Sequence, residues 1–255
     1  MLFTVDIGNT NITLGMFRGE DLIMRWRMAT NRNSMPDEFG MQFWFLFEHN
    51  GINPENIKGI CISSVVPQIT SKVEDACDYY FKRPILEVNY KLKLGMKIDI
   101  DHPAELGNDR IADSVAVKAL YGTPSCLIDF GTATTFNILN REGNYVGGAI
   151  SAGIQTSADA LFLKTAQLPN VNIQKPPCVI GKNTVNSMQS GLFYGYISMV
   201  EGMVERCKQE LGDEDMQVIA TGGYAKILSQ ETSCIDKVDS WLTMTGLRLI
   251  WEMNQ

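Results

Sequence analysis

Histidine is scarce in this sequence of 255 residues, and its cysteines are not paired. Two histidines, His49 and His102, are too few for a histidine-rich metal centre. No two cysteines occur as C-x-x-C, so neither zinc-ligand spacing nor a disulfide framework is indicated. We therefore expect reduced and mostly buried cysteines. They are Cys61, Cys77, Cys126, Cys178, Cys207 and Cys234.

Long apolar runs and a secretory leader are also missing. No apolar stretch is long enough to span a bilayer. Residues 2–5 begin a strand-like run and lack the basic segment and apolar core of a signal peptide. We therefore expect a cytoplasmic protein with no membrane partner.

Excess positive charge is absent as well. The chain has 22 Lys and Arg against 29 Asp and Glu, a net charge of −7. A nucleic-acid surface needs clustered basic side chains to replace phosphate counterions, so we expect no nucleic-acid partner and favour a small-molecule one. With 45% hydrophobic and 20% charged residues the composition is that of an ordinary globular protein. The length permits one large domain or two small ones.

The first half of the chain has the pattern of an α/β domain. Apolar residues at 2–17 and 22–28, around the turn "RGED", predict a hairpin. A helix is predicted after it, with Ser34 and Asp37 as a capping signature, Pro36 in the first turn and Gly51 at the end. The elements predicted next are, in order, a buried strand within 57–67, a helix from Ile69 to Tyr80 and a strand at 85–88.

One motif occurs twice. "VDIGNTNITLG" at 5–15 and "LIDFGTATTFNIL" at 127–139 both run an apolar strand into Asp-x-Gly and then into small hydroxyl or amide residues. The two aspartates, Asp6 and Asp129, are 129 − 6 = 123 residues apart, about half the chain. A predicted helix within 105–122 separates the copies. We therefore predict a duplicated domain, divided into residues 1–117 and 118–255, with the two motifs facing a pseudo-symmetric cleft.

Such a motif suits phosphate binding. Glycine lets the backbone approach a phosphate, and the residues after it offer N–H and side-chain donors. A single copy would more often be an ordinary turn, but two copies at this spacing favour a polyphosphate site. A third glycine turn, "QVIATGGYAKIL" at 217–228, suits the flat face of a base, although strand-Gly-Gly-helix turns are common without ligands.

In this order the three segments resemble the phosphate and adenosine segments of the superfamily of sugar kinases, acetate kinase, actin and heat-shock chaperone ATPases. The resemblance implies an α/β protein of two ribonuclease-H-like domains with a nucleotide cleft between them.

The most specific stretch is "HPAELGNDR" at 102–110. Its Glu105, Gly107, Asp109 and Arg110 resemble the Glu-x-Gly-x-Asp-Arg segment of type III pantothenate kinases. Other segments of the chain resemble that family in collinear order. They are "DIGNT" at 6–10, "SSVVP" at 63–67, "DFGTATT" at 129–135, "GKNTVNSMQSGLFYG" at 181–195, "TGG" at 221–223 and "LTMTGL" at 242–247.

This resemblance implies ATP-dependent phosphorylation of pantothenate to 4′-phosphopantothenate, the first step toward coenzyme A. Asp109 would be the general base, and Asp129 would help to hold a monovalent cation, K⁺ or NH₄⁺, while Mg²⁺ accompanies ATP. The implied ATP-binding residues are Asp6, Ile7, Gly8, Asn9, Thr10, Asn11, Ile12, Thr13 and Thr132. The implied pantothenate-binding residues are Gly107, Asn108, Asp109, Arg110 and Thr184.

The family also implies a homodimer, in which the long helical pattern at 185–211 takes part and Thr184 reaches pantothenate bound by the other subunit. Periodicity alone favours core packing for this helix, whose apolar stripe is Leu192, Tyr196, Met199, Met203 and Cys207, with Phe193 and Val200 beside it.

Simpler roles remain open for the site residues. Asp109 could be a helix N-cap, Arg110 a solvated first-turn residue, Thr184 a loop hydroxyl and Asp129 a turn former. Two other functions also stay open: a non-enzymatic accessory or regulatory homologue of the family, and a phosphohydrolase on the same fold.

Overall fold

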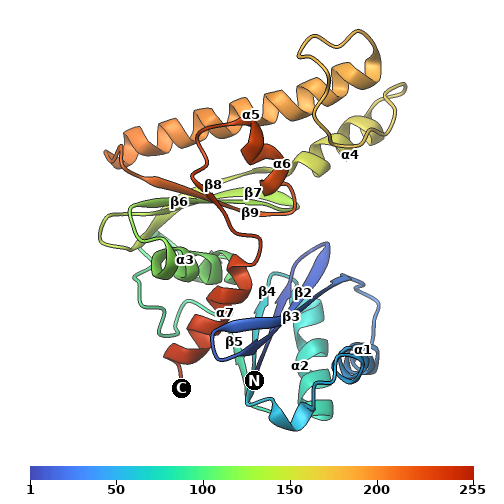
Figure 1. The fold of residues 1–255 in the computed structure, drawn as a ribbon, viewed down its shortest axis with the longest axis vertical. Helices are drawn as coiled ribbons and strands as arrows, with labels where there is room; N and C mark the ends of the chain where they lie inside the picture. Colours follow the sequence, from blue (N-terminus) through green and yellow to red (C-terminus); the bar gives the residue numbers. More distant parts are fainter. The chain divides into compact units, whose positions relative to one another are not determined.

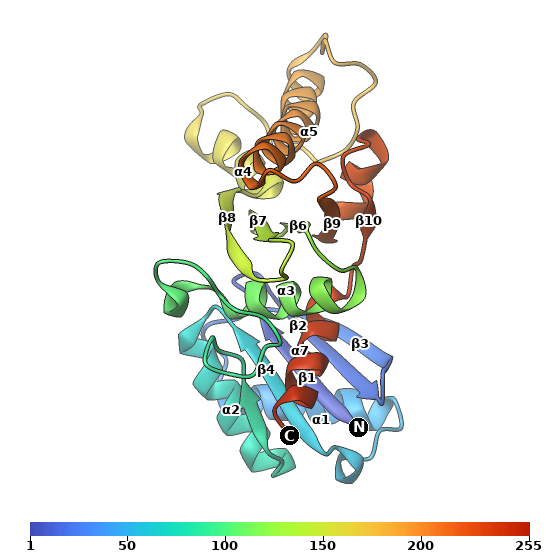
Figure 2. The same cartoon turned by 90° about the vertical axis from the view of Figure 1, so that its left-hand side faces the viewer.

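The computed structural model describes residues 1–255, which form two compact units. The first unit consists of residues 1–97, 101–116 and 242–255, and the second of residues 98–100 and 117–241. Each unit is built on a five-stranded mixed sheet covered by helices (Figures 1 and 2).

The sheet of the first unit has the order β3-β2-β1-β4-β5. Its strands are β1 Leu2–Ile7, β2 Asn11–Arg18, β3 Asp21–Ala29, β4 Gly59–Ser64 and β5 Ile85–Glu87. The first three pair antiparallel, whereas β1 pairs with β4, and β4 with β5, in parallel. The predicted hairpin was wrong in one respect: residues 2–17 form two strands, because Gly8 N–H donates to Asn11 O at 3.0 Å and closes a turn.

Helices α1 (Pro36–His49) and α2 (Pro67–Phe81) cover one face of this sheet (Figure 1). Inward-facing Phe3, Val5 and Ile7 of β1 pack against both helices, which places the core of the unit here. The core side chains contributed by the two helices are Phe39, Phe43, Phe47, Ile69, Val73, Ala76, Cys77 and Phe81.

The predicted positions of α1 and α2 are confirmed, but the predicted cap of α1 was wrong. The N-cap is Met35, whose backbone N–H donates to the Glu38 carboxylate at 2.6 Å. Asp37 instead accepts the Tyr80 hydroxyl at 3.1 Å. At the other end, Asn50 is the C-cap and Gly51 follows it with φ +65°, the left-handed conformation that commonly ends a helix.

The opposite face of the sheet is covered by α7 (Leu242–Met253), since alternate residues of a strand point to opposite faces. Thr4 Oγ1 contacts Met244 Sδ at 3.3 Å, and the backbone of Ala112 in α3 (Asn108–Leu120) lies directly against Gly246. The predicted boundary after residue 117 lies one residue from the division at 116/117. Residues 242–255, however, belong to the first unit and not to the second, because α7 packs on the first sheet.

The second unit repeats this topology. Its sheet has the order β10-β9-β6-β7-β8, where β6 corresponds to β1 and β9 to β4. Its strands are β6 Ser125–Phe130, β7 Ala133–Leu139, β8 Tyr145–Ala152, β9 Gln217–Gly222 and β10 Lys237–Val238. In parallel pairs at equivalent positions, Asp6 lies beside Ser63 and Asp129 beside Thr221. The predicted duplication is confirmed at the level of strand order.

Helix α5 (Thr184–Leu211) lies along one face of the second sheet, while α4 (Ile154–Lys164) and the short α6 (Ala225–Leu228) complete the unit (Figures 1 and 2). The buried residues of α5 include Phe193, Tyr196, Ile197, Val200 and Val204. The outer members of the predicted stripe, Met199, Met203 and Cys207, are partly buried against the same core. Core packing therefore accounts for the apolar periodicity of α5.

Short 3₁₀ helices occupy Pro54–Asn56, Pro103–Glu105 and Ser229–Glu231. None of the helices has both the length and the apolar character needed to cross a membrane.

The docking of α7 on the first sheet gives a stability prediction. A Cβ on Gly59 would lie 1.9 Å from the ring of Trp251. We expect Gly59→Ala to destabilise the protein by about 1–3 kcal/mol through overpacking, measured by urea unfolding. In the Gly59→Ala background, Trp251→Phe should recover part of this loss because the smaller ring makes room. If the costs of the two substitutions simply add, Trp251 does not pack on Gly59.

Candidate functional site

The turn after β1 is exposed but firmly held. Thr30, directly after β3, donates its hydroxyl to Gly8 O at 2.7 Å and its N–H to Thr10 O at 2.9 Å. Arg32 Nη2 donates to Asn9 Oδ1 at 3.3 Å. A fixed turn with exposed residues at 9–11 can present backbone N–H groups to an anion.

Lys72 of α2 holds the segment that supports this turn. Its Nζ donates to Arg32 O at 3.0 Å and to Ser34 O at 2.9 Å. Within the predicted ATP-binding run, Ile7 and Ile12 are fully buried in the hydrophobic core. Their side chains face away from any ligand, so only the main chain of these two residues is available for binding.

Asp109 lies in the first turn of α3. The helix begins at Asn108, so Asp109 is inside the helix and is not its N-cap. Its Oδ1 accepts the N–H of Arg110 at 2.7 Å. A Cβ on Gly107 would lie only 2.5 Å from the same oxygen, so the glycine is what allows the carboxylate to occupy this position.

The start of α3 is attached to the end of β4. Asn108 Nδ2 donates to Ser64 O at 3.3 Å, and Val65 N–H donates to Ile7 O at 3.1 Å. Because β1 and β4 are parallel, their carboxyl ends meet at one edge of the sheet. The first unit thus brings Asp6, the turn at 8–10 and the segment 107–110 to that edge. Of the residues that make these ties, Thr30 and Lys72 carried no sequence signal that we recognised, whereas Ser64 lies in the "SSVVP" segment.

The electrostatics of Asp109 are set by its surroundings. The residue is half-buried, and its Oδ1 lies against Gly107 and the N–H of Arg110. Burial raises the pKa of the Asp109 carboxyl above its ordinary value, and the N–H and positive charge of Arg110 offset part of that rise. A raised pKa makes the carboxylate a stronger proton acceptor.

In the second unit Asp129 occupies the end of β6, and its carboxylate lies against Gly222. A Cβ on Gly222 would meet Asp129 Oδ1 at 2.5 Å, and the φ of Gly222 is +92°, which side chains rarely tolerate. A Cβ on Gly131 would lie 3.2 Å from the other carboxylate oxygen. The second Asp-x-Gly motif and the "TGG" turn are therefore neighbours around this carboxylate.

Helix α4 supports both of these loops. Thr132 O accepts the N–H of Gly153 at 3.1 Å and the hydroxyl of Thr156 at 2.7 Å. Tyr224, which follows "TGG", donates its hydroxyl to Gln155 at 2.8 Å. The supporting residues in α4 follow β8 without a recognisable motif, so the sequence did not predict their role.

Asp129, the residue that the resemblance assigned to a monovalent cation, offers a single carboxylate. No three His, Cys, Asp or Glu side chains of the chain are grouped so as to hold a metal ion. A cation held by a single carboxylate takes its remaining ligands from water and from substrate phosphates. A dedicated zinc-type or transition-metal centre is not what these residues offer.

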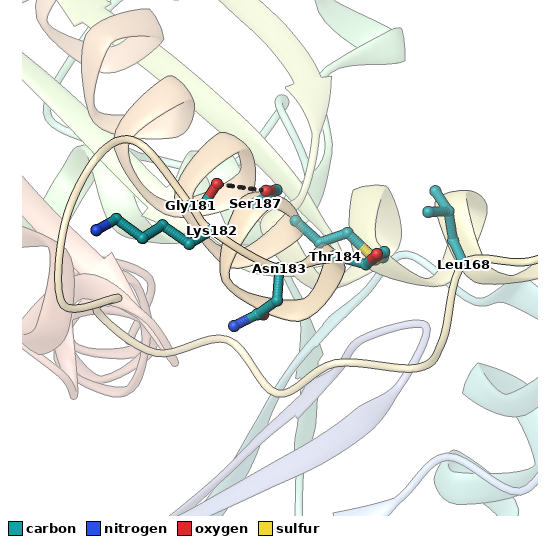
Figure 3. A pocket seen from close by; sticks show the side chains of 7 residues that line it. Leu168, Gly181, Lys182, Asn183, Thr184 and Ser187 are labelled. Atoms are coloured by element: carbon teal, nitrogen blue, oxygen red, sulfur yellow. Dashed lines mark hydrogen bonds between the residues drawn. The ribbon is translucent and has the colours of Figure 1, made fainter.

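Thr184 is the first residue of α5 and lines an open pocket of about 580 Å³ within the second unit (Figure 3). The N-cap Asn183 accepts the N–H of Asn186 at 2.8 Å, and Ser187 donates its hydroxyl to Gly181 O at 3.2 Å. The pocket is lined by Leu168, Gly181, Lys182, Asn183, Thr184, Ser187 and Met188. Thr184 is the one predicted site residue in this lining.

Two units of this topology, each with an aspartate near the end of its central strand, form the two-domain ribonuclease-H-like fold. The chain belongs to the type III pantothenate kinase family, whose sequence model matches residues 2–206. Family and fold together identify it as a kinase.

Solved structures support the fold. The chain is similar to a protein from Campylobacter jejuni proposed as a conserved Baf family transcriptional activator, with 17% identity, a TM-score of 0.63 and coverage of 99% of this chain and 98% of that one. It is also similar to an inorganic polyphosphate/ATP-glucomannokinase from Arthrobacter, with 14% identity, a TM-score of 0.52 and coverage of 99% and 97%.

Component A of (R)-2-hydroxyglutaryl-CoA dehydratase from Acidaminococcus fermentans matches over 100% of both chains, with 11% identity and a TM-score of 0.55. At these identities the similarity concerns the fold alone, and it confirms the two-domain, ribonuclease-H-like prediction.

The raised pKa of Asp109 predicts an unusual stability profile for Asp109→Asn. At neutral pH the folded wild type carries a buried carboxylate, a cost that the neutral asparagine removes, so Asp109→Asn should melt at the same or a higher temperature. As the pH falls through the raised pKa, the wild type takes up its proton and the difference should shrink. Thermal unfolding between pH 4 and pH 8 measures this. A variant that melts lower than wild type at neutral pH would show that the carboxylate stabilises the helix start.

Proposed function

We propose that this protein transfers the γ-phosphoryl group of ATP to the primary hydroxyl of pantothenate, giving 4′-phosphopantothenate. The observation that carries the proposal is the placement of Asp109: its carboxyl group lies at the start of α3, packed on Gly107 and bound by the N–H of Arg110, within the segment that resembles the family's Glu-x-Gly-x-Asp-Arg motif.

In this reaction Asp109 accepts the proton of the pantothenate hydroxyl and directs the oxygen in line with the γ-phosphorus. Its raised pKa suits that role, since the proton acceptor must bind a proton as the new bond forms. Asp109 acts through proton transfer and orientation, while most of the acceleration in phosphoryl transfer comes from positioning and charge stabilisation.

The two glycine turns serve ATP. The fixed turn at 8–10 offers backbone N–H groups for phosphate oxygens, and Thr132 with its supports in α4 does the same in the second unit. Asp6 and Asp129, at equivalent strand ends, are the carboxylates available to cations that accompany ATP. When bound, Mg²⁺ and K⁺ or NH₄⁺ supply positive charge that neutralises the phosphate oxygens.

Pantothenate is bound by the segment from Gly107 to Arg110. The guanidinium of Arg110 suits the carboxylate of pantothenate, because the two groups can form charge-assisted hydrogen bonds. Thr184, exposed in its open pocket, contributes a hydroxyl to pantothenate held by the other subunit of a homodimer.

A coupled assay for ADP tests the reaction. We expect ADP formation to require both pantothenate and K⁺ or NH₄⁺, and Asp109→Asn to lower kcat by roughly 10²-fold or more. Sodium replaces potassium in the control reaction. Equal rates in sodium would contradict the role of the monovalent cation.

Two other results of this assay would contradict the proposed function and support one of the alternatives. ADP formation at the same rate without pantothenate identifies a phosphohydrolase, with water as the acceptor. No ADP formation with any of these additions, despite measured nucleotide binding, leaves an accessory or regulatory protein.

The shared site predicts rescue in mixed dimers. Chains with Asp109→Asn and chains with Thr184→Val should each be inactive alone, and partly active together once subunits have exchanged. In a mixed dimer one of the two symmetry-related sites receives both intact residues.

Subunit exchange has to be demonstrated first, for example with two affinity tags on the two variants. Mixed dimers that stay inactive would place Asp109 and Thr184 in one chain's site, while the kinase assignment would stand.

A further inference from the structure

The side chain of Asn108 is directed into the protein. Its Nδ2 donates to the main-chain carbonyl of Ser64 at 3.3 Å, across 44 positions of sequence. Ser64 is the last residue of β4, and Asn108 is the first residue of α3. One hydrogen bond thus joins the end of a central strand to the start of the helix that carries Asp109.

The acceptor of this bond lies in the corner between the end of β4 and the start of α2, which several hydrogen bonds hold in place. Ser64 Oγ accepts the N–H of Val66 at 3.0 Å and lies 2.7 Å from the hydroxyl oxygen of Thr70. The N–H of Val65 donates to Ile7 O at 3.1 Å, which ties the corner to the end of β1. The carbonyl of Ser64 is therefore fixed relative to the strand that carries Asp6.

The hydrogen bond from Arg110 N–H to the Asp109 carboxylate does not attach the start of α3 to the sheet. Both residues belong to the first turn of α3, and Ile111 donates its N–H at 3.1 Å to the carbonyl of Gly107, the residue just before the helix. Such bonds shape the turn but move with it. The bond from Asn108 to Ser64 crosses from the turn to the sheet and therefore sets where the turn lies.

We propose that Asn108 is a positioning residue: by binding Ser64 it fixes the Asp109 carboxylate at the edge of the sheet, and its side chain does not bind pantothenate. The inference rests on the proposed function for its kinetic consequence. A misplacement of about 1 Å can cost a catalytic group about 10²-fold in rate. A lost positioning contact lowers kcat, whereas a lost substrate contact raises KM.

The first test is kinetic. We expect Asn108→Ala to lower kcat for pantothenate phosphorylation by roughly 10- to 100-fold, with KM for pantothenate changed by less than about threefold. Asn108→Gln keeps an amide donor and should retain more of kcat than Asn108→Ala. The matched control is Asn53→Ala, which removes another asparagine hydrogen bond of the first unit, from Glu55 N–H at 2.9 Å, and should leave kcat unchanged.

The second test needs no activity. Hydrogen exchange of the Arg110 and Ile111 amides, measured by NMR, should be faster in Asn108→Ala than in wild type and unchanged in Asn53→Ala. Unchanged exchange in Asn108→Ala would overturn the positioning role. So would a tenfold rise in KM with kcat retained, which assigns the side chain to substrate. Wild type that does not phosphorylate pantothenate refutes the proposed function instead, and the exchange rates still decide whether Asn108 holds the turn.

Discussion

The parallel pairing of β1 with β4, and of β6 with β9, is the constraint on which the candidate site depends. Adjacent parallel strands end at the same edge of a sheet, so the loops that follow them must begin side by side. In the first unit this pairing places Asp6 beside Ser63, and in the second it places Asp129 beside Thr221. The turns that follow β1 and β6, the start of α3 and the "TGG" turn all take their positions from these strand ends.

Two of the three aspartates of the proposed mechanism, Asp109 and Asp129, lie against a glycine. A Cβ on Gly107 would approach Asp109 to 2.5 Å, and a Cβ on Gly222 would approach Asp129 equally closely. In each case the missing side chain lets a carboxylate settle close to the backbone, and at Asp109 burial raises the pKa of the carboxyl group. In both halves of the chain, a glycine without a side chain makes room for a carboxylate, although the two sites lie at different points of the repeated fold.

The sequence was most informative where its signals were local and repeated. The two Asp-x-Gly motifs predicted the duplication because a strand followed by this turn can be read within about ten residues. The hairpin prediction, however, treated residues 2–17 as one apolar run. The turn from Gly8 to Thr10 is so short that the apolar pattern did not show it dividing this run into two strands. The sequence pattern also predicted Ser34, and not Met35, as the N-cap of α1. Side-chain type did not indicate Met35, because the hydrogen bond at that position is donated by its backbone N–H to the Glu38 carboxylate.

Long-range contacts could not be read in the same way. The bond between Asn108 and Ser64 joins residues 44 positions apart, and nothing in either neighbourhood announces it. The hydrogen bonds that Gly153 and Thr156 donate to the carbonyl of Thr132 likewise have no signal in the sequence. Motif resemblance singled out Asp109, Asp129 and Asn108, while the contacts that hold these residues in place emerged only from the fold.

The packing of α7 on the first sheet has a consequence for the order in which the protein forms during synthesis. Residues 242–255 leave the ribosome after the whole of the second unit, which is contiguous apart from residues 98–100. Until then, Gly59 and Thr4 lack the cover that Trp251 and Met244 provide. Domains usually mature from the amino terminus onward. Here the unit whose synthesis starts first is the one whose assembly is completed last.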